Sequence, residues 1–349
     1  MARIPSMKPG VLLIRADASL AIGTGHVMRC LALAQAWQDA GGTVSLVVAE
    51  LPDALLPRLT AEGVSLSRVH AIPGSPEDAG ETVAQARRLR ANWVVIDGDR
   101  FGSDFLKAVR VAGFRILLID DFADRESFPA DLIVNPNLDD DGERYRKRGA
   151  TARLLIGPSY VLLRREFREG AKKREIRQTG NRILVTLGGS DPDNLTPKIA
   201  NALAHRSNLE VTAIAGPGYD KADELRKRNA SNLRIVFNPP SIAQFMNGSD
   251  QAIIAAGGTL WELLSMGCAV LSYSRNIVQA RVVQALAQRG AAIDMGDTCH
   301  FDPAKLAASV KELVDSHLAR ERMTTLGRML VDGMGTTRVV EAAQRSEVQ

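Results

Sequence analysis

Short apolar runs alternate with amphipathic helical stretches along the first half of the chain. The apolar runs lie at residues 11–17, 44–50, 93–98, 116–121 and 132–137. Most of them are apolar at consecutive positions, so both faces of each strand are expected to be buried. Buried strands with helices between them are typical of a parallel sheet that helices cover on both sides.

A second series of the same kind follows a polar, arginine-rich region, residues 138–181, which holds one more expected strand within 154–167. The expected strands of this series lie at 182–191, 209–216, 233–240, 251–258, 268–274 and 290–296. We therefore expect an α/β protein with two doubly wound, Rossmann-like domains that face each other across a cleft, with ligands at the carboxyl ends of the strands. The expected segments are a domain at 10–165, a domain at 181–325 and a C-terminal helix at 326–349. Packing of that helix back onto the first domain is one arrangement open to it.

Composition narrows the functional classes. The net charge of +4 suits an anionic small molecule, and aromatic residues make up only 5% of the chain, with no basic stretch interleaved among them. Nucleic-acid binding is therefore not expected. The three cysteines share no CxxC spacing, which argues against a disulfide framework and a zinc site. We expect a cytoplasmic protein with no cofactor, no metal and no membrane span. The oligomeric state stays open, a monomer included.

The stretch "IGTGHVMRCLALAQAW", residues 22–37, combines a glycine turn with the start of a helix. Gly23 and Gly25 supply two glycines of a dinucleotide-binding fingerprint, but Met28 occupies the third position, which disfavours an NAD(P) site. The next apolar positions fall on one helical stripe and are expected in the core, namely Val27, Cys30, Leu31, Ala34 and Trp37.

His26 lies in the first turn of this helix, just off the apolar stripe. It could be a polar residue without a role, or a general base that the positive helix N-terminus keeps neutral. Among the aspartates that end strands, Asp17 lies next to the histidine loop and is the one we favour as functional. The others, Asp97, Asp120 and Asp121, could simply cap the helices that follow them.

Two glycine pairs follow strands in the second half. Gly257, Gly258 and Thr259 lead from a strand into a helix, where backbone N–H groups can bind a phosphate. Glu262, one turn into that helix, could accept hydrogen bonds from ribose hydroxyls or only stabilise the helix dipole. The pair Gly188-Gly189 could wrap a diphosphate or permit a tight turn.

Four motifs together resemble one enzyme family. They are "RADASLAIGTGHVMRCLALA", "LIGPSYVLLRREF", "VTLGGSDPDN" and "AAGGTLWELLSMGCAVL", and the resemblance spans residues 15–279 in order. The chain resembles the UDP-2,4-diacetamido-2,4,6-trideoxy-β-L-altropyranose hydrolases. These enzymes act in the biosynthesis of pseudaminic acid, a nonulosonic acid of cell-surface polysaccharides, and have the two-domain GT-B fold.

The resemblance implies a metal-independent mechanism. UDP would lie mainly on the C-terminal domain, and His26 would activate water for attack on the anomeric carbon, releasing UDP with inversion. We add Asp17 to the catalytic group. The expected substrate-binding residues are Gly25, Arg29, Gly188, Gly189, Gly257, Gly258, Thr259, Glu262, Asn276 and Gln279.

Two departures from the family pattern concern the sugar. Asp99 stands where the family often has a tyrosine, and the "NQ" pair appears as Asn276 and Gln279, separated by two residues. A GT-B glycosyltransferase that moves a nucleotide-linked amino or deoxy sugar to an acceptor hydroxyl is the alternative. A non-catalytic nucleotide-sugar-binding protein is a third possibility. Release of free sugar and UDP without any acceptor would favour the hydrolase.

Overall fold

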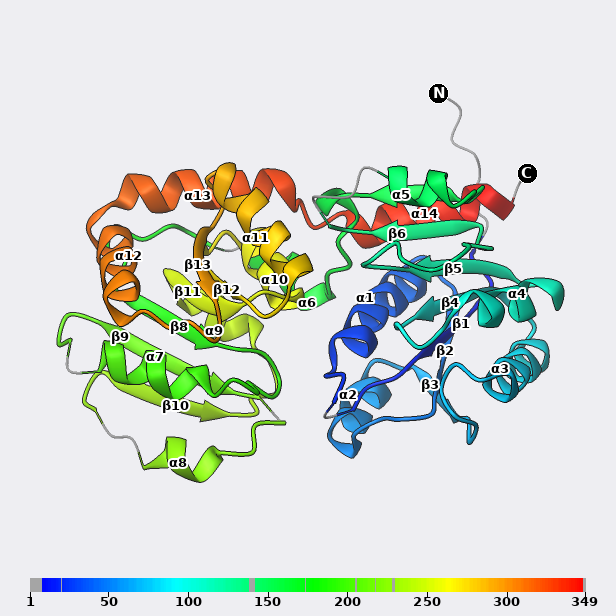
Figure 1. Ribbon diagram of the computed structural model, residues 1–349, viewed down its shortest axis with the longest axis horizontal. Helices are drawn as coiled ribbons and strands as arrows, with labels where there is room; N and C mark the ends of the chain where they lie inside the picture. Colours follow the sequence, from blue (N-terminus) through cyan, green and yellow to red (C-terminus); the bar gives the residue numbers. More distant parts are fainter. Residues whose placement is uncertain are drawn as a thin grey trace. The chain divides into compact units, whose positions relative to one another are not determined.

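The computed structural model describes residues 8–19, 21–137, 142–172, 174–204, 206–216, 218–227 and 230–347. Residues 138–141 of the polar region expected from the sequence lie outside these ranges. The chain divides into two compact units, which are described separately below (Figure 1). The first unit contains residues 1–165 together with 334–349, and the second contains residues 166–333.

A seven-stranded parallel sheet forms the centre of the first unit, in the order β3-β2-β1-β4-β5-β6-β7. Its strands are β1 (Val11–Ala16), β2 (Thr43–Val48), β3 (Ser65–Arg68), β4 (Ala91–Asp97), β5 (Arg115–Ile119), β6 (Leu132–Asn135) and β7 (Arg153–Ile156). Most of these strands match the expected apolar runs. The exception is β3, an edge strand with the sequence SLSR that carries no apolar run and was not predicted.

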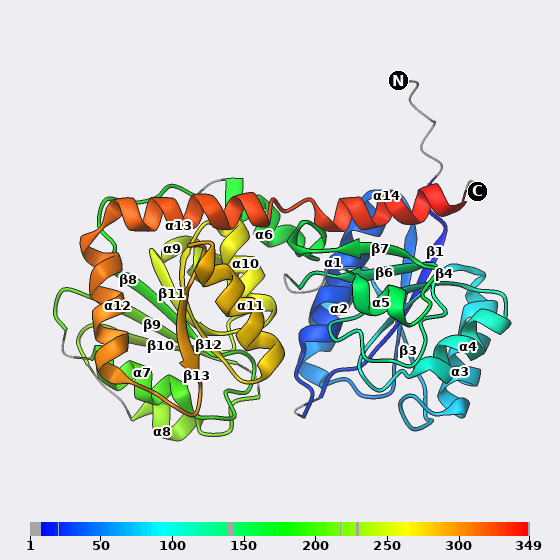
Figure 2. The ribbon, with the colours of Figure 1, turned by 45° about the horizontal axis from the view of Figure 1, so that its top comes forward.

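Helices cover both faces of this sheet. They are α1 (Gly25–Asp39), α2 (Leu56–Ala61), α3 (Pro76–Leu89), α4 (Ser103–Val111), α5 (Glu143–Lys147) and α14 (Gly335–Glu347), with 3-10 turns η1 (Asp53–Leu55) and η2 (Pro158–Tyr160). Side chains alternate along β1, so Leu12 and Ile14 join the core under α1 and α14, whereas Leu13 joins the core under α3 and α4. Helix α14 lies against α1 although some 300 residues separate them in the chain (Figure 2).

The second unit contains a six-stranded parallel sheet in the order β10-β9-β8-β11-β12-β13. Its strands are β8 (Arg182–Thr186), β9 (Glu210–Ala215), β10 (Leu233–Phe237), β11 (Gln251–Ala255), β12 (Ala269–Ser274) and β13 (Ile293–Asp297). Its helices are α6 (Arg165–Lys172), which begins at the last residue of the first unit, α7 (Leu195–Leu203), α8 (Ala222–Arg226), α9 (Ala243–Gly248), α10 (Gly258–Met266), α11 (Ile277–Gln288), α12 (Pro303–Asp315) and α13 (His317–Leu330). Within this unit α7 packs beside α12, whereas α10 and α11 lie against β12 (Figure 1).

Both sheets reverse their direction of growth at one point. In the first sheet the reversal lies between β1 and β4, and in the second it lies between β8 and β11. The loops that leave the carboxyl ends of two such strands diverge to opposite faces, which is where open α/β sheets bind their ligands. His26 follows β1, and the glycine turns follow β8 and β11, so the topology brings both candidate regions to reversal points. No helix of the described residues is long and apolar enough to cross a membrane.

Candidate active site

His26 reaches the carboxyl end of β4 from the first turn of α1. Parallel pairing of β1 with β4 sets Ala16 opposite Asp97, the last residue of β4. The ring Nδ1 of His26 lies 2.8 Å from Oδ1 of Asp97, although the two residues are 71 positions apart in the chain. Helix capping was the simple possibility that the sequence left open for Asp97, and in the structure its carboxylate contacts His26 and Arg29.

The Asp97 carboxylate is buried and saturated with donors. Arg29 donates from Nε to Oδ2 at 2.7 Å and from Nη2 to Oδ1 at 2.6 Å. The Cys30 thiol lies 3.4 Å from Oδ2, and the Asp97 side chain has no exposed surface. Because an ionised carboxylate only accepts hydrogen bonds, Nδ1 of His26 must carry the hydrogen between them. The contacts of this imidazole with other described residues involve Nδ1, which leaves Nε2 as the nitrogen with a free lone pair.

Neighbouring charges shift the pKa values of Asp97 and His26 in opposite directions. Burial alone would raise the pKa of Asp97, but Arg29 and His26 hold that pKa well below its ordinary value. Burial alone would lower the pKa of His26, but the Asp97 carboxylate outweighs it and the pKa of His26 is raised. The expected neutralising effect of the helix N-terminus is therefore not what dominates at His26. The imidazole is a stronger base than an isolated histidine, and its side chain keeps 19% of its surface exposed.

Arg29 binds carboxylates on two strand ends. Besides Asp97 it contacts Asp121, which follows β5, with Nη1 at 2.9 Å and 2.8 Å from the two carboxylate oxygens. Nε, Nη1 and Nη2 of the guanidinium are thus all engaged within the first unit. Arg29 was expected from the sequence to bind the substrate, and in the structure Asp97 and Asp121 occupy these three nitrogens. Gly25, the first residue of α1, stays exposed next to His26.

Asp17, the aspartate favoured from the sequence, is not in the contact network of His26. Its Oδ1 accepts hydrogen bonds from Arg15 Nη1 at 2.7 Å and from the backbone N–H groups of Ala49 and Glu50 at 2.7 Å and 3.1 Å. These bonds join the end of β1 to the end of β2. Oδ2 of Asp17 is buried and has no hydrogen-bond partner among the described residues, so one acceptor of this carboxylate remains unused.

The glycine turns of the second unit expose backbone. Gly188 adopts φ +89°, which favours glycine, and a Cβ added at Gly188 or Gly189 would meet no atom within 4 Å. The loop after β9 braces this turn, because Gly218 N donates to Gly189 O at 2.9 Å. A Cβ added at Gly216 would lie 2.5 Å from the Gly189 backbone, so only glycine permits this approach.

Helix α10 begins next to this turn, at the adjacent strand β11. Its N-cap is Gly257, which offers no side chain to the free N–H groups of the first turn. By contrast, the Asp191 carboxylate accepts hydrogen bonds from the first N–H groups of α7, from Leu195 N at 3.0 Å and Thr196 N at 2.8 Å. Gly257 and Gly258 are exposed and a Cβ on either meets no atom within 4 Å. Thr259 and Glu262, farther along the same helix, are half-buried.

The end of β12 supplies a cation that the sequence reasoning missed. Arg275 follows β12 directly, and its guanidinium reaches the loop after β8, with Nη2 3.4 Å from Leu187 O and Nε 3.2 Å from Asp193 Oδ2. The hydroxyl of Ser274, the last residue of β12, is buried without a hydrogen-bond partner among the described residues. An arginine directly after a strand of this second series was the signal that could have pointed to it.

Asn276 and Gln279 form a reciprocal cap on α11. Asn276 Oδ1 accepts from Gln279 N at 2.9 Å, and Gln279 Oε1 accepts from Arg275 N at 2.9 Å. The two side-chain oxygens are therefore used to fix the loop after β12. Their separation by two residues, which differs from the family's adjacent pair, is the spacing that such a cap requires.

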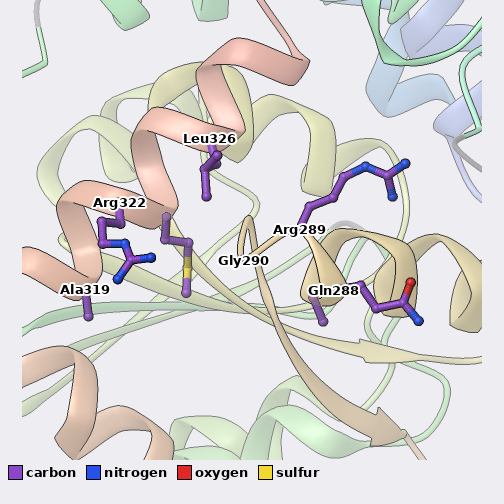
Figure 3. A pocket seen from close by; sticks show the side chains of 8 residues that line it. Gln288, Arg289, Gly290, Ala319, Arg322 and Leu326 are labelled. Carbon is purple, nitrogen blue, oxygen red and sulfur yellow. The ribbon is translucent and has the colours of Figure 1, made fainter.

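A cavity lies elsewhere in the second unit. A space of about 380 Å³ separates the end of α11 from α13, lined by Gln288, Arg289, Gly290, Arg322, Leu326 and their neighbours (Figure 3). It adjoins the amino end of β13, whereas the glycine turns and Arg275 follow carboxyl ends of strands. Figure 3 shows the Arg289 side chain pointing away from Arg322 and Leu326. Among the described residues, no group of three or more His, Cys, Asp and Glu side chains could hold a metal ion.

Comparisons with known proteins give a consistent picture. No family model matches the chain. It is 27% identical over 284 residues to the UDP-2,4-diacetamido-2,4,6-trideoxy-β-L-altropyranose hydrolase of Campylobacter jejuni, covering 80% of this chain and 97% of that protein. It is 26% identical over 249 residues to the spore coat polysaccharide biosynthesis protein SpsG of Bacillus subtilis, covering 69% and 73%. An uncharacterized protein of Methanocaldococcus jannaschii is 24% identical over 75% of this chain, which spans 55% of that protein's length. The resemblance drawn from the motifs is thereby confirmed.

Solved structures settle the fold. MurG of Acinetobacter baumannii, at 17% identity, aligns with a TM-score of 0.65 over 97% of this chain and all of that one. The chain has the GT-B fold. A glycosyltransferase of kitacinnamycin, also at 17% identity, aligns with a TM-score of 0.68 over 97% of this chain and 99% of that one. At these identities the GT-B likeness concerns the fold alone and leaves the reaction open.

Proposed function

We propose that this chain is a hydrolase that cleaves a UDP-linked 2,4-diacetamido-2,4,6-trideoxy sugar into free sugar and UDP. The observation that carries this proposal is the contact of 2.8 Å between Nδ1 of His26 and the buried Asp97 carboxylate, which leaves Nε2 as the basic nitrogen of a partly exposed imidazole. The similarity to the Campylobacter hydrolase over 97% of that enzyme's length supports the substrate class. Asp97, rather than Asp17, is the carboxylate that orients the base.

The reaction is a direct displacement. His26 Nε2 takes a proton from water, and the water oxygen forms a bond to the anomeric carbon. The bond from that carbon to the diphosphate oxygen breaks, and its electron pair leaves with UDP, so the configuration inverts. Asp97 stabilises the imidazolium that forms at His26. A positioned general base of this kind contributes roughly 10²- to 10⁴-fold to a rate.

UDP would bind to the second unit. The uncapped N–H groups at Gly257, Gly258 and Thr259 would bind the diphosphate, with the Gly188-Gly189 turn beside them, and Glu262 would accept from the ribose hydroxyls. Arg275 lies beside the Gly188-Gly189 turn, where its guanidinium, now paired with Asp193, would contact the leaving diphosphate. Asn276 and Gln279, whose oxygens hold the cap of α11, would present their amide NH₂ groups to the substrate. This scheme assigns no metal and no cofactor.

The test is hydrolysis without an acceptor. The full chain is incubated with UDP-linked diacetamido sugars in water enriched in ¹⁸O, and UDP and free sugar are quantified by mass spectrometry. Equal amounts of UDP and free sugar, with ¹⁸O at the anomeric position, support the hydrolase. His26→Ala should keep UDP affinity and lose about 10²- to 10⁴-fold in rate. His70→Ala, which removes an exposed histidine of the same unit, is the matched control and should keep full activity.

A glycosyltransferase is the second candidate, because the GT-B neighbours include sugar-transferring enzymes. The same base could deprotonate an acceptor hydroxyl instead of water. UDP release that depends strictly on an added acceptor would favour transfer and contradict hydrolysis. UDP binding without any turnover would instead indicate a nucleotide-sugar-binding protein without catalysis.

A further inference from the structure

Arg29 connects helix α1 to the carboxyl ends of two strands of the first sheet. Its guanidinium donates to both oxygens of Asp97 at the end of β4 and to both oxygens of Asp121 just after β5. The Asp97 side chain has no exposed surface, whereas Arg29 and Asp121 keep 22% and 23%. The three side chains therefore lead from the interior to the surface in the order Asp97, Arg29, Asp121. His26 contacts Asp97, the buried member.

The formal charges of these side chains bear directly on the base. With His26 neutral, two carboxylates and one guanidinium give a net charge of −1, and proton uptake by His26 brings the group to zero. Without Arg29, the imidazole would face two unbalanced carboxylates and would hold its proton more tightly. Without Asp121, the positive charge of Arg29 would be less balanced, and the imidazole would lose its proton more readily.

We propose that Arg29 and Asp121 are a positioning pair for His26, in which Arg29 fixes the Asp97 carboxylate against the imidazole and Asp121 fixes Arg29. This inference rests on the proposed function, in which His26 is the base. It assigns Arg29 to control of the base instead of to binding of the substrate. The pair acts through Asp97, and neither member needs to touch the sugar.

Other titratable and charged groups around His26 come from α1 and from the loops that follow β4 and β5. From α1, Cys30 contacts Asp97, and burial raises the pKa of this thiol, which keeps it neutral. From the loop after β4, Asp99 interacts with His26, and burial raises the pKa of Asp99. Arg125 interacts with Asp99 and pairs with Asp120 after β5. Asp99 and Arg125 stay unchanged in the variants below, so they contribute equally to each comparison.

The test measures the His26 titration by NMR in the full chain without substrate, with the His26 signal assigned by its loss in His26→Ala. Arg29→Gln should raise the pKa of His26 by about one, because a charge at this distance changes a pKa by about 1–3. Asp121→Asn should lower it. Arg29→Lys keeps the charge and should restore a titration close to that of the wild type. On the acid limb, kcat/KM of Arg29→Gln should fall about tenfold, since raising the pKa of His26 by about one leaves about a tenth of the neutral imidazole at a given pH.

Opposite changes of the His26 pKa in Arg29→Gln and Asp121→Asn support the pair, because a merely structural role would give both variants the same loss of stability and no ordered change. Equal changes, or none, overturn the inference. If Arg29→Gln does not fold, the comparison of Asp121→Asn with wild type still decides, since an unchanged or raised pKa contradicts the pair. Opposite changes without any hydrolysis of UDP-sugars would refute the proposed function and leave the electrostatic arrangement intact.

Discussion

Substituting Asp97 by asparagine tests the base most directly, because it keeps the size of the side chain and changes only its chemistry. Oδ1 of Asp97 accepts from His26 and Arg29, and Oδ2 accepts from Arg29 and contacts the Cys30 thiol. An asparagine has a single acceptor oxygen, so one of the two positions becomes an NH₂ group that faces donors. Wherever the NH₂ group lies, at least one bond from Arg29 is lost.

The expected loss of kcat in Asp97→Asn follows from the hydrogen on the His26 ring. If the NH₂ group faces His26, Nδ1 must become the acceptor, and the hydrogen moves to Nε2, the nitrogen that should take the proton from water. Loss of the carboxylate that fixes a catalytic histidine costs about 10⁴-fold in the Ser-His-Asp enzymes. We expect Asp97→Asn to lose about 10²- to 10⁴-fold in kcat, with unchanged affinity for UDP, because the proposed UDP residues lie in the other unit.

The same change affects stability and pH dependence. Removing one partner of a buried ion pair costs about 3–5 kcal/mol, and we expect the lower end because Arg29 keeps Asp121. The lowered pKa of Asp97 gives stability that is complete above the ordinary aspartate value of about 3.9 and is lost as the pH falls. The raised pKa of His26 has the opposite sign, with stability present below about pH 6.5 and lost as the pH rises through the folded value. In Asp97→Asn the pKa of His26 should fall, which moves the acid limb of kcat/KM to lower pH.

The assay combines UDP release between pH 5 and 9, urea unfolding at several pH values, and UDP titration calorimetry. Asp104→Asn, at an aspartate of α4 whose side chain is 96% exposed, is the matched control and should behave as wild type. Asp97→Asn with wild-type kcat and an unmoved acid limb would refute the orientation of His26 by Asp97. A loss of UDP affinity equal to the loss in kcat would instead indicate general damage to the fold.

Two further predictions concern the proposed UDP region of the second unit. Arg275→Gln should raise the Kd for UDP about tenfold, since a hydrogen bond to a charged group is worth about 1.5–3 kcal/mol. It should leave the NMR titration of His26 unchanged. An unaltered Kd by calorimetry would show that Arg275 does not bind UDP. Gly258→Ala should unfold at the same urea concentration or a higher one, because its Cβ meets no atom within 4 Å and alanine favours a helix by about 0.5–1 kcal/mol. The variant should nevertheless bind UDP more weakly, because the added methyl group covers the N–H groups at the start of α10. Wild-type UDP affinity in Gly258→Ala would contradict phosphate binding at this helix start.

The apolar pattern was sufficient to predict most of the strands and the core face of α1. Val27, Cys30, Leu31, Ala34 and Trp37 are all buried, as their helical spacing predicted. The pattern failed at β3, because an edge strand with the sequence SLSR buries little apolar surface and shows no apolar run. The pattern also could not show that residues 30–37 of α1 are all buried, the polar Gln35 included. The second face of α1 is covered by α14, which comes from the far end of the chain. The buried side chain of Gln35 accepts a hydrogen bond from Arg165 N at 2.8 Å.

The sequence by itself determined the two α/β units, the glycine turns and a histidine at the start of a helix. Those features follow from local chemistry, namely apolar periodicity, backbone freedom at glycine and spacing within one helix. Only the tertiary structure decided that Asp97 is the partner of His26, that Arg29 binds carboxylates, and that Arg275 lies beside the glycine turn. These contacts depend on which strands become neighbours in the sheet, and β4 pairs with β1 only after the chain has passed through β2 and β3. Residues 71 positions apart carry no local signal of that pairing, because the burial of whole strands sets it.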